Sequence, residues 1–235
     1  MNLLAIDTSN NVLGVSILKG DLVVGDVMTN LTRNHSVRLM PAVENLMKDV
    51  GLKPEELDRI AVANGPGSYT GVRIGVSTAK TMAWALDIPV VGVSSLEVLA
   101  YQGRFFDGYI CPFFDARRGL VFTGLYEWKG NGPELVTAES NMLMEDLLRS
   151  LAEKEKNVLF LSQDIAVFRE EIQAALGERA IIPEGPYHFP RASHLGLAGA
   201  KKPVQDIHAL VPNYLRLAEA EANWLKAQKE DRKDG

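Results

Sequence analysis

The sequence has little of what disulfides and protein-bound metals require. It contains one cysteine, Cys111, so no intramolecular disulfide can form, and the apolar residues around it indicate a buried thiol. The four histidines show neither HxxxH nor HExxH spacing, which would place two imidazoles on one helical face. We therefore expect no metal ligated by the protein. The histidines are His35, His188, His194 and His208.

Excess positive charge and long apolar runs are also missing. The 235 residues carry 25 Lys and Arg against 30 Asp and Glu, a formal net charge of −5. An autonomous nucleic-acid binder needs concentrated positive charge, so we expect any action on nucleic acid to occur through a partner. No apolar stretch could span a bilayer and none near Met1 resembles a signal peptide, which predicts a cytoplasmic protein without membrane contact. No GxSxG elbow is present, and no serine has an evident histidine partner.

What the sequence does contain is a strand and helix order that occurs twice. Alternating and continuous apolar runs predict the strands, and apolar residues at helical spacing predict the helices. In the first half we predict strands at 3–6, 12–18, 22–28, 59–63 and 89–93, with helices at 36–50 and 94–101 and a further helix that follows the glycine-rich turn and runs to Leu86. In the second half we predict strands at 109–114, 119–128, 135–138, 157–161 and 180–182, with helices at 141–154, 165–176 and 192–200.

This repeated order predicts an α/β protein of two βββαβα lobes, with a ligand cleft between them. The order is that of the duplicated actin, sugar-kinase and chaperone-ATPase fold, which is ribonuclease H-like. We expect an N-terminal lobe at 1–101 and a smaller C-terminal lobe at 102–212. A last helix at 213–230 should pack back onto the body, since its apolar residues share one face.

A glycine-rich stretch from Asn64 to Lys80 is the most distinctive part of the chain. It follows a short apolar strand and leads into a helix, so its glycines allow a tight strand-to-helix turn. Such a loop can hold phosphate on its backbone amides, but it lacks the Walker spacing. The other interpretation is a turn whose small residues serve packing. Within the helix a ridge of small residues repeats every fourth position, at Gly71, Gly75, Ala79 and Ala83.

Two further features bear on function. The helix at 36–50 has an unusually wide apolar stripe, which either contacts a second protein or simply covers the sheet well. In the cleft, an acidic residue that ends the first strand of this superfamily works with magnesium and phosphate, which makes Asp7 the candidate. The alternative is that Asp7, Thr8 and Ser9 cap a turn. Asp115 and Arg117 open the equivalent strand pair of the second half. They either bind phosphate or are surface charges or part of an interdomain ion pair.

Six segments, in order along nearly the whole chain, carry a specific resemblance. They are Asp7-Thr-Ser9, His35-Ser-Val-Arg-Leu-Met-Pro41, Gly65-Pro-Gly-Ser-Tyr-Thr-Gly-Val-Arg-Ile-Gly75 with Ala79-Lys80, Gly92-Val-Ser-Ser-Leu96, Asp115-Ala-Arg117 and Pro212-Asn-Tyr-Leu-Arg216. Together they resemble the TsaB (YeaZ) family. The resemblance implies a subunit needed for N6-threonylcarbamoyladenosine, the tRNA modification 3′ of the anticodon. It also implies a TsaD-like catalytic paralogue and a TsaE-like ATPase as partners, with tRNA bound only through the complex.

Departures from TsaD indicate a subunit without catalytic residues, a pseudoenzyme. Two metal-binding histidines of that paralogue fall on Ser95 and Leu99 here, and Leu99 cannot ligate a metal. Residues 161–164, Leu-Ser-Gln-Asp, stand where the paralogue has a Gly-Gly turn that faces the adenosine. We therefore expect no firm cofactor, and weak ATP or ADP binding only at an interface or in the cleft. The cleft site would be vestigial, with Asp7, Thr8, Ser9, Asp115 and Arg117.

The wide helix and the small-residue ridge predict one interface for the paralogue and, when the chain is alone, for a homodimer. The predicted interface residues are Leu39, Met40, Val43, Met47, Gly71, Gly75, Ala79, Met82 and Ala83. On this hypothesis, glutamate at position 40 or 75 abolishes pairing and leaves the monomer folded. Three other functions compete with it: a small-molecule kinase or ATPase that uses Asp7, a peptidase, and a free-standing tRNA binder with Arg33, Arg38 or Arg117.

Overall fold

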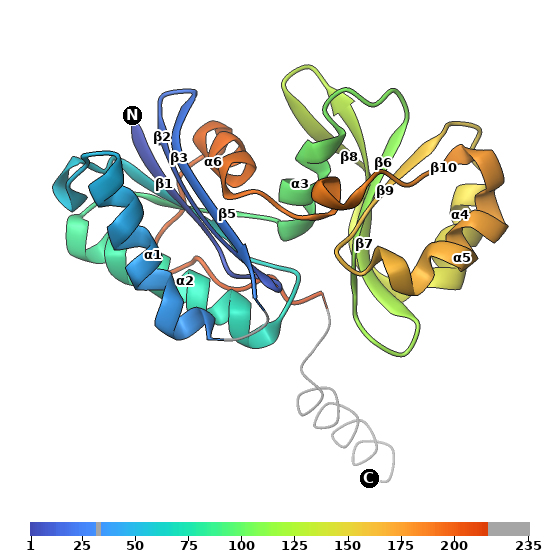
Figure 1. Ribbon diagram of the computed structural model, residues 1–235, viewed down its shortest axis with the longest axis horizontal. Helices are drawn as coiled ribbons and strands as arrows, with labels where there is room; N and C mark the ends of the chain where they lie inside the picture. The colour runs from blue at the N-terminus through green and yellow to red at the C-terminus, as the bar shows by residue number, and fades with distance from the viewer. Residues whose placement is uncertain (32–33, 216–235) are drawn as a thin grey trace, which may run out of the picture.

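The computed structural model describes residues 1–31 and 34–215. Two five-stranded sheets form two lobes side by side (Figure 1). The predicted α/β fold with two βββαβα lobes is confirmed. The helix predicted at 213–230 lies outside the described residues except for its first three positions. Arg33 also lies outside them. In the described part of the chain, no helix is long and apolar enough to cross a membrane.

The first sheet combines a three-stranded meander with two parallel strands. Its order is β3-β2-β1-β4-β5, with β1 antiparallel to β2 and parallel to β4. The helices that follow these strands are α1, α2 and α3. The strands are β1 (Asn2–Asp7), β2 (Val12–Lys19), β3 (Leu22–Asn30), β4 (Arg59–Ala63) and β5 (Val90–Val93); the helices are α1 (His35–Asp49), α2 (Tyr69–Leu86) and α3 (Ser95–Ala100).

The second sheet repeats this topology. Its order, β8-β7-β6-β9-β10, again places the third, second, first, fourth and fifth strands of the lobe side by side. This identity of order supports the predicted duplication. The strands are β6 (Tyr109–Asp115), β7 (Leu120–Lys129), β8 (Gly132–Leu143), β9 (Val158–Leu161) and β10 (Ala180–Ile181); the helices are α4 (Met144–Ala152), α5 (Ile165–Leu176) and α6 (Ala192–Lys201).

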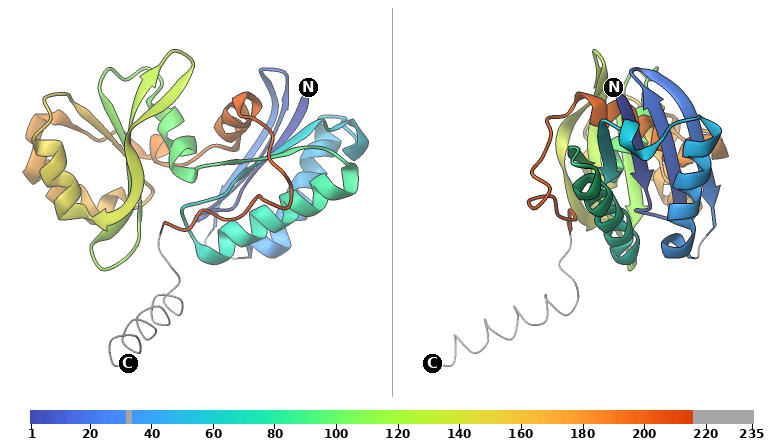
Figure 2. Two further views of the ribbon diagram at one scale, coloured as in Figure 1. Left: turned by 180° about the vertical axis from the view of Figure 1, so that it is seen from behind. Right: turned by 90° about the vertical axis from the view of Figure 1, so that its left-hand side faces the viewer.

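Each sheet is covered on both faces, because successive side chains of a strand point to opposite sides. In β1, Leu4 and Ile6 pack with α1 and α2, whereas Leu3 and Ala5 pack with α6. In β6, Phe113 packs with α4 and α5 on one face, and Phe114 on the other face packs with α3. Figures 1 and 2 show α3 and α6 between the two sheets.

The two lobes therefore exchange one helix each. Leu96 and Leu99 of α3 pack on the second sheet, although α3 was assigned to the lobe at 1–101. Helix α6, assigned to the lobe at 102–212, packs on the first sheet through Ala192, Leu195 and Ala198. The division near residue 101 stays a prediction, but helix packing crosses it in both directions.

The small-residue ridge of α2 does not lie on the surface. A Cβ on Gly75 would stand 2.6 Å from Thr8 Oγ1, and one on Gly71 would collide with the backbone oxygen of Thr8. Ala79 and Ala83 are at most 1% exposed. The ridge lets α2 approach the chain's own β1 and β4 closely, so these four residues pack within the chain and their predicted role in an interface stays a prediction.

The apolar stripe of α1 also serves mostly the monomer. Leu39, Val43 and Met47 are 1%, 2% and 5% exposed and belong to the core between α1 and the first sheet. These three predicted interface residues are thus buried in the single chain, and their role in an interface stays a prediction. Met40 is 46% exposed and Met82 is partly buried, so only these two of the nine predicted interface residues reach the surface.

Candidate functional site between the lobes

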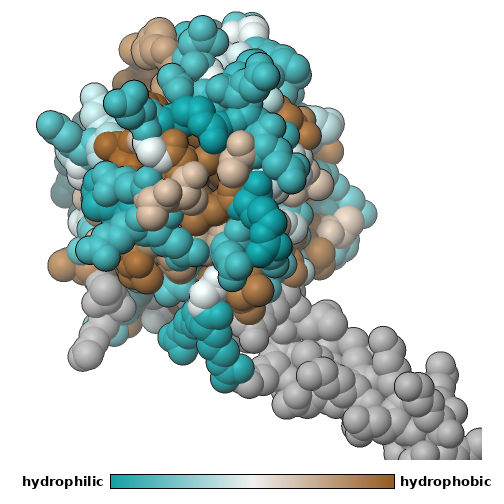
Figure 3. All heavy atoms as spheres, turned by 90° about the vertical axis from the view of Figure 1, so that its right-hand side faces the viewer, coloured by the Kyte–Doolittle hydropathy of each residue, from teal (hydrophilic) through white to brown (hydrophobic). Residues whose placement is uncertain are grey.

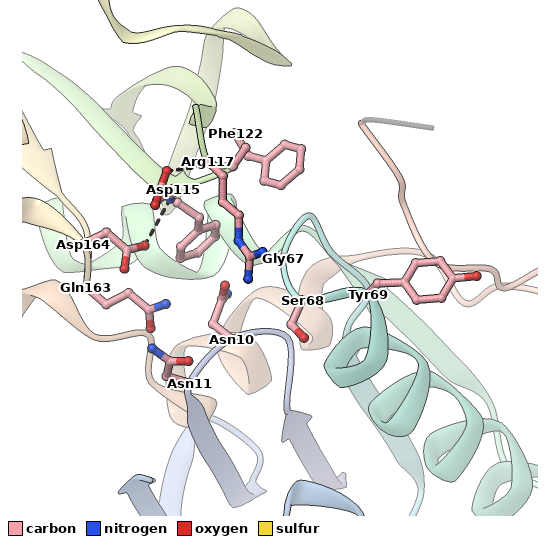
Figure 4. A pocket seen from close by; sticks show the side chains of 12 residues that line it. Asn10, Asn11, Gly67, Ser68, Tyr69, Asp115, Arg117, Phe122, Gln163 and Asp164 are labelled. Carbon is pink, nitrogen blue, oxygen red and sulfur yellow. Dashed lines mark hydrogen bonds between the residues drawn. The ribbon is translucent and has the colours of Figure 1, made fainter. Parts of the chain in front are cut away.

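A cavity of about 470 Å³ opens between the lobes where two hairpins face each other. The first lobe contributes the β1–β2 turn and the start of α2, and the second contributes the β6–β7 turn and the start of α5. Figure 4 shows the side chains that line it. The lining residues are Asn10, Asn11, Gly67, Ser68, Tyr69, Phe114, Asp115, Ala116, Arg117, Phe122, Gln163 and Asp164.

The start of α2 is locked onto the first hairpin by backbone contacts. The Ser68 amide donates to the Ser9 carbonyl over 2.7 Å, and Ser68 Oγ caps the helix by accepting from the Gly71 amide. Gly67 needs the absence of a side chain, because its Cβ would collide with the Ser9 carbonyl and its φ is +159°. Thr8 Oγ1 donates to the Gly71 carbonyl over 2.7 Å. The loop is therefore a packed turn in this chain.

On the second lobe, Arg117 is presented by an unusual turn. Arg117, Arg118 and Gly119 have φ values of 66°, 58° and 73°, all left-handed. Asp115 Oδ1 supports this turn by accepting from the Arg117 amide over 2.8 Å. Figure 4 shows the Arg117 side chain extending across the cavity toward Asn10 and Gly67 of the first lobe.

Two carboxylates lie beside Arg117. The Asp115 amide donates to Asp164 Oδ2 over 3.1 Å, which joins the β6–β7 turn to the start of α5. Burial raises the pKa of Asp164, and the charge of Asp115 raises it further, although the bond from the Asp115 amide opposes both effects. The cavity lining thus holds one guanidinium and two carboxyl groups, so it has no surplus of positive charge for a polyphosphate.

Asp7 is separated from this cavity. It is 1% exposed and is not among the lining residues. Its Oδ1 accepts from the amide and the hydroxyl of Ser9, over 2.9 and 2.7 Å, whereas Oδ2 has no hydrogen-bond partner. Burial raises the pKa of Asp7, an effect that the bonds from Ser9 and the charge of His35 partly offset.

These residues do not fit the magnesium nucleotide that the fold superfamily implies. Its acidic residue would have to reach the phosphates, but Asp7 is buried behind Ser9 and its free oxygen is enclosed. The carboxyl groups of Asp115 and Asp164 line this cavity, where they would repel phosphate oxygens. Among the described residues, no three His, Cys, Asp or Glu side chains gather as metal ligands.

The structure thus brings together two of the five predicted cleft residues. Asp115 and Arg117 line the cavity, whereas Asp7, Thr8 and Ser9 lie behind it in the turn that supports it. Sequence reasoning did not select Asn10, Asn11, Phe114 or Phe122. Asn10 and Asn11 could have been selected from the sequence, because they follow Asp7-Thr-Ser9 immediately and form the predicted turn.

The metal position of the paralogue is also closed here. Ser95 and Leu99 both lie on α3 and are 0% exposed, because α3 is enclosed between the sheets. Ser95 Oγ is buried without a hydrogen-bond partner. Neither side chain can take part in chemistry in the cleft.

Comparison with known proteins places this geometry in a family. A family model for TsaD, the tRNA N6-adenosine threonylcarbamoyltransferase, matches residues 24–224. The chain is 52% identical over 229 residues to the tRNA threonylcarbamoyladenosine biosynthesis protein TsaB of Bacillus subtilis, which covers 97% of this chain and 100% of that protein. A second relative, TsaB of Escherichia coli, is 33% identical over 134 residues.

Solved structures agree with the sequence relatives. YeaZ from Pseudomonas aeruginosa superposes with a TM-score of 0.78 at 27% identity and covers 91% of this chain and 99% of that chain. The ethanolamine utilization protein EutJ from Carboxydothermus hydrogenoformans has a TM-score of 0.50 at 12% identity over 84% of this chain and 89% of its own, which shows a shared fold alone. The match to the Bacillus protein extends over nearly the full length of both chains, and the chain therefore belongs to the TsaB (YeaZ) family.

Proposed function

We propose that this chain is a non-catalytic partner subunit in the biosynthesis of N6-threonylcarbamoyladenosine in tRNA. The observation that carries the proposal is the 52% identity, over 97% of this chain, to a protein named for that biosynthesis. The partners in the proposal are a TsaD-like paralogue, which performs the transfer, and a TsaE-like ATPase. Binding of tRNA occurs only within the complex.

The burial of two sets of residues supports the non-catalytic part of the proposal. The acidic residue of the first strand is enclosed, and the positions of the paralogue's histidines hold Ser95 and Leu99 in the protein interior. A kinase or ATPase that uses Asp7 needs this carboxylate at the phosphates. Its burial therefore argues against that alternative.

Partner binding is assigned to the exposed part of α1 and α2. These helices lie next to each other on one face of the first sheet (Figures 1 and 2). Val37 is 70% exposed and Met40 is 46% exposed on α1, and Ile74 and Met82 are partly buried on α2. We define these four side chains as the α1–α2 surface. Apolar side chains of this kind, grouped on two adjacent helices, are typical of a helical interface.

The decisive experiment measures transfer of threonylcarbamoyl from threonylcarbamoyl-adenylate to unmodified tRNA by TsaD and TsaE, with and without this chain. The proposal expects transfer only when both this chain and TsaD are present, and none with this chain alone. Transfer by this chain alone would contradict its non-catalytic role. Transfer that is indifferent to the chain, together with Mg-ATP turnover lost in Asp7→Ala, would favour the kinase alternative.

The proposed interface on the α1–α2 surface is tested by the same change, valine to glutamate, at two sites on different faces of the molecule. Val37→Glu lies on the α1–α2 surface, and Val167→Glu lies on α5, where the valine is 68% exposed. Figure 3 shows hydrophilic side chains around a smaller apolar patch at the α4–α5 end of the molecule. Val37→Glu should lower binding of TsaD and self-association in analytical ultracentrifugation at least tenfold, about 1.4 kcal/mol, and Val167→Glu should change neither. Equal effects of the two variants would remove this surface from the proposal.

A further inference from the structure

A second cavity, of about 420 Å³, lies between the lobes where β4 and β5 end. The first lobe contributes the residues that follow β4 and β5, the second contributes β7 and β8, and the segment after α6 closes one side. We call it the β8 cavity. Its lining residues are Asn64, Gly92, Ser94, Glu97, Tyr126, Pro133, Leu135, Glu139, Lys202 and Asn213. None of them lines the cleft that contains Arg117.

Glu139 on β8 has one free carboxylate oxygen in this cavity. Its Oε1 accepts from the Ser94 hydroxyl and from the Tyr126 hydroxyl. Its Oε2 has no hydrogen-bond partner in the described part of the chain, and no cation there pairs with Glu139. Burial, together with the charges of Glu139 and Glu97, raises the pKa of Tyr126, which keeps its hydroxyl protonated and donating.

Hydrogen-bond donors also line the cavity. The side-chain amides of Asn64 and Asn213 have no hydrogen-bond partner among residues 1–31 and 34–215, although their backbones are joined by a 2.7 Å bond from the Asn213 amide to the Asn64 carbonyl. Lys202 Nζ forms a 2.9 Å ion pair with Glu97 and remains 36% exposed. Two side-chain amides and an ammonium group therefore line the same cavity as Glu139.

The charges that line the cavity do not balance. Lys202 neutralises Glu97, which leaves the carboxylate of Glu139 without a positive partner. A half-buried carboxylate with a free oxygen favours a ligand that brings its own cation. Leu135 and Pro133 add a short apolar wall, and the volume is in the range of small-molecule pockets.

We propose that the β8 cavity binds a small zwitterion of the α-amino acid class. The ammonium group of the ligand meets Glu139 Oε2, and its carboxylate accepts from the amides of Asn64 and Asn213 and from Lys202. The ligand would then bridge the two lobes, because its ammonium and carboxylate partners come from different lobes. This site is separate from the α1–α2 surface and does not depend on the proposed role in tRNA modification.

The test is a thermal-shift screen of the full chain with the twenty standard α-amino acids, followed by calorimetric titration of the best one. A ligand that binds only the folded state raises the melting temperature. We expect at least one amino acid to bind with a Kd below about 1 mM, and its N-acetyl derivative, which lacks the ammonium group, to bind at least tenfold more weakly. No binding by any amino acid, or equal binding by the N-acetyl derivative, would overturn the proposal.

Three variants locate the site. Glu139→Gln keeps an oxygen that accepts from Ser94 and Tyr126 but removes the charge, so we expect at least a tenfold loss of affinity with the fold retained. Leu135→Trp, at a 53% exposed position, fills the cavity and should also block binding. The control is Glu171→Gln, an exposed carboxylate on α5, which should bind as the unmodified chain does. Unchanged affinity in both Glu139→Gln and Leu135→Trp would show that the amino acid binds elsewhere.

Discussion

Single residues decide how closely the elements around the cleft approach each other. Gly67 and Gly71 bring α2 against the backbone of the β1–β2 turn, where no side chain has room. Asp7 Oδ2 and Ser95 Oγ, by contrast, are buried without partners. Unsatisfied buried groups of this kind cost stability, and they lie next to the cleft or behind it.

The first prediction concerns Gly71. Gly71→Ala should lower the free energy of unfolding by about 1–3 kcal/mol despite the better helix propensity of alanine, because the added Cβ collides with the Thr8 carbonyl, which is backbone and cannot rotate away. Urea unfolding followed by circular dichroism measures this change. Ser77→Ala, on the exposed side of the same helix, should stay within about 0.5 kcal/mol of the unmodified chain. A Gly71→Ala variant of unchanged stability would contradict the packing described here.

The second prediction concerns His194, which stacks against Tyr101 with ring centroids 5.7 Å apart. Burial, with the charges of Arg191 and Arg104, lowers its pKa to about 4. Between pH 7 and pH 5 the unfolded state binds a proton at this residue and the folded state does not. The free energy of unfolding should therefore decrease by about 2 kcal/mol from this group when the pH is lowered from 7 to 5. In His194→Phe, which keeps an aromatic ring, this part of the pH dependence should disappear.

The control for this prediction is His208→Gln. His208 is exposed, so this variant removes one imidazole from the surface rather than from the interior. Urea unfolding at both pH values measures the difference in unfolding free energy for all three proteins. An identical pH dependence in His194→Phe and the unmodified chain would show that His194 is protonated equally in both states.

At the scale of elements, the two ends of α2 are set by the capping residues Ser68 and Asp87. Helix α2 begins at Ser68, whose hydroxyl caps it, and ends at Asp87 in a left-handed conformation with φ 53°. Glycine is the usual residue at such a position, because other residues pay for the left-handed conformation. An acidic residue at a helix C-terminus is also unfavourable for the helix dipole.

Asp87→Gly should therefore stabilise the protein by about 0.5–1 kcal/mol. The measurement is the midpoint of urea unfolding, compared between proteins whose unfolding free energy depends on urea concentration with the same slope. The control is Ser77→Gly, at an exposed position in the middle of the same helix. It should lower the free energy of unfolding by about 1 kcal/mol, because glycine is unfavourable inside a helix. If Asp87→Gly destabilised the chain, the carboxylate of Asp87 would have to make a contact that outweighs the left-handed backbone.

Elements were largely predictable from the sequence, because apolar alternation marks each buried strand. The exception is β8, predicted at 135–138 and found at Gly132–Leu143. Most of its residues are polar or exposed, so no alternation marks its ends, and its length follows from pairing with β7. The small-residue ridge of α2 predicted a close approach correctly but not its partner, since spacing along a helix does not say what lies opposite.

The cleft was predictable only in part for a similar reason. Asp115 and Arg117 were found because they follow a predicted strand in the repeated pattern. Asn10 and Gln163 are more than 150 positions apart in the sequence, and only the facing of the two lobes brings them to one cavity. Whether the Asp7 side chain lies in the cavity or behind it depends on tertiary packing. The sequence around Asp7 does not predict that packing.

At the scale of the molecule, each lobe depends on a helix encoded in the other half. Helix α6 covers Leu3, Ala5, Ala61 and Val91 of the first sheet, and its small residues allow this closeness. A Cβ on Gly196 would stand against Leu18, and one on Gly199 would stand 2.5 Å from Ala61 Cβ. Without α6, one face of the first sheet is bare.

A fragment of residues 1–101 should therefore bind the apolar dye ANS and unfold without cooperativity. Addition of a peptide with residues 188–215 should reduce the dye fluorescence, because α6 covers the exposed face. The same peptide with Gly196→Trp should fail to do so, since the indole collides with Leu18. Cooperative unfolding of the fragment alone, without dye binding, would contradict the dependence.

The position of α6 also sets an order of events at the ribosome. The first sheet is synthesised early, but the helix that covers its inner face leaves the exit tunnel only after the whole second lobe has been made. The first lobe must therefore wait with an apolar face open to solvent while some 90 further residues are added, at a rate of about 5–20 residues per second. That interval of several seconds is when the nascent chain has most need of a chaperone.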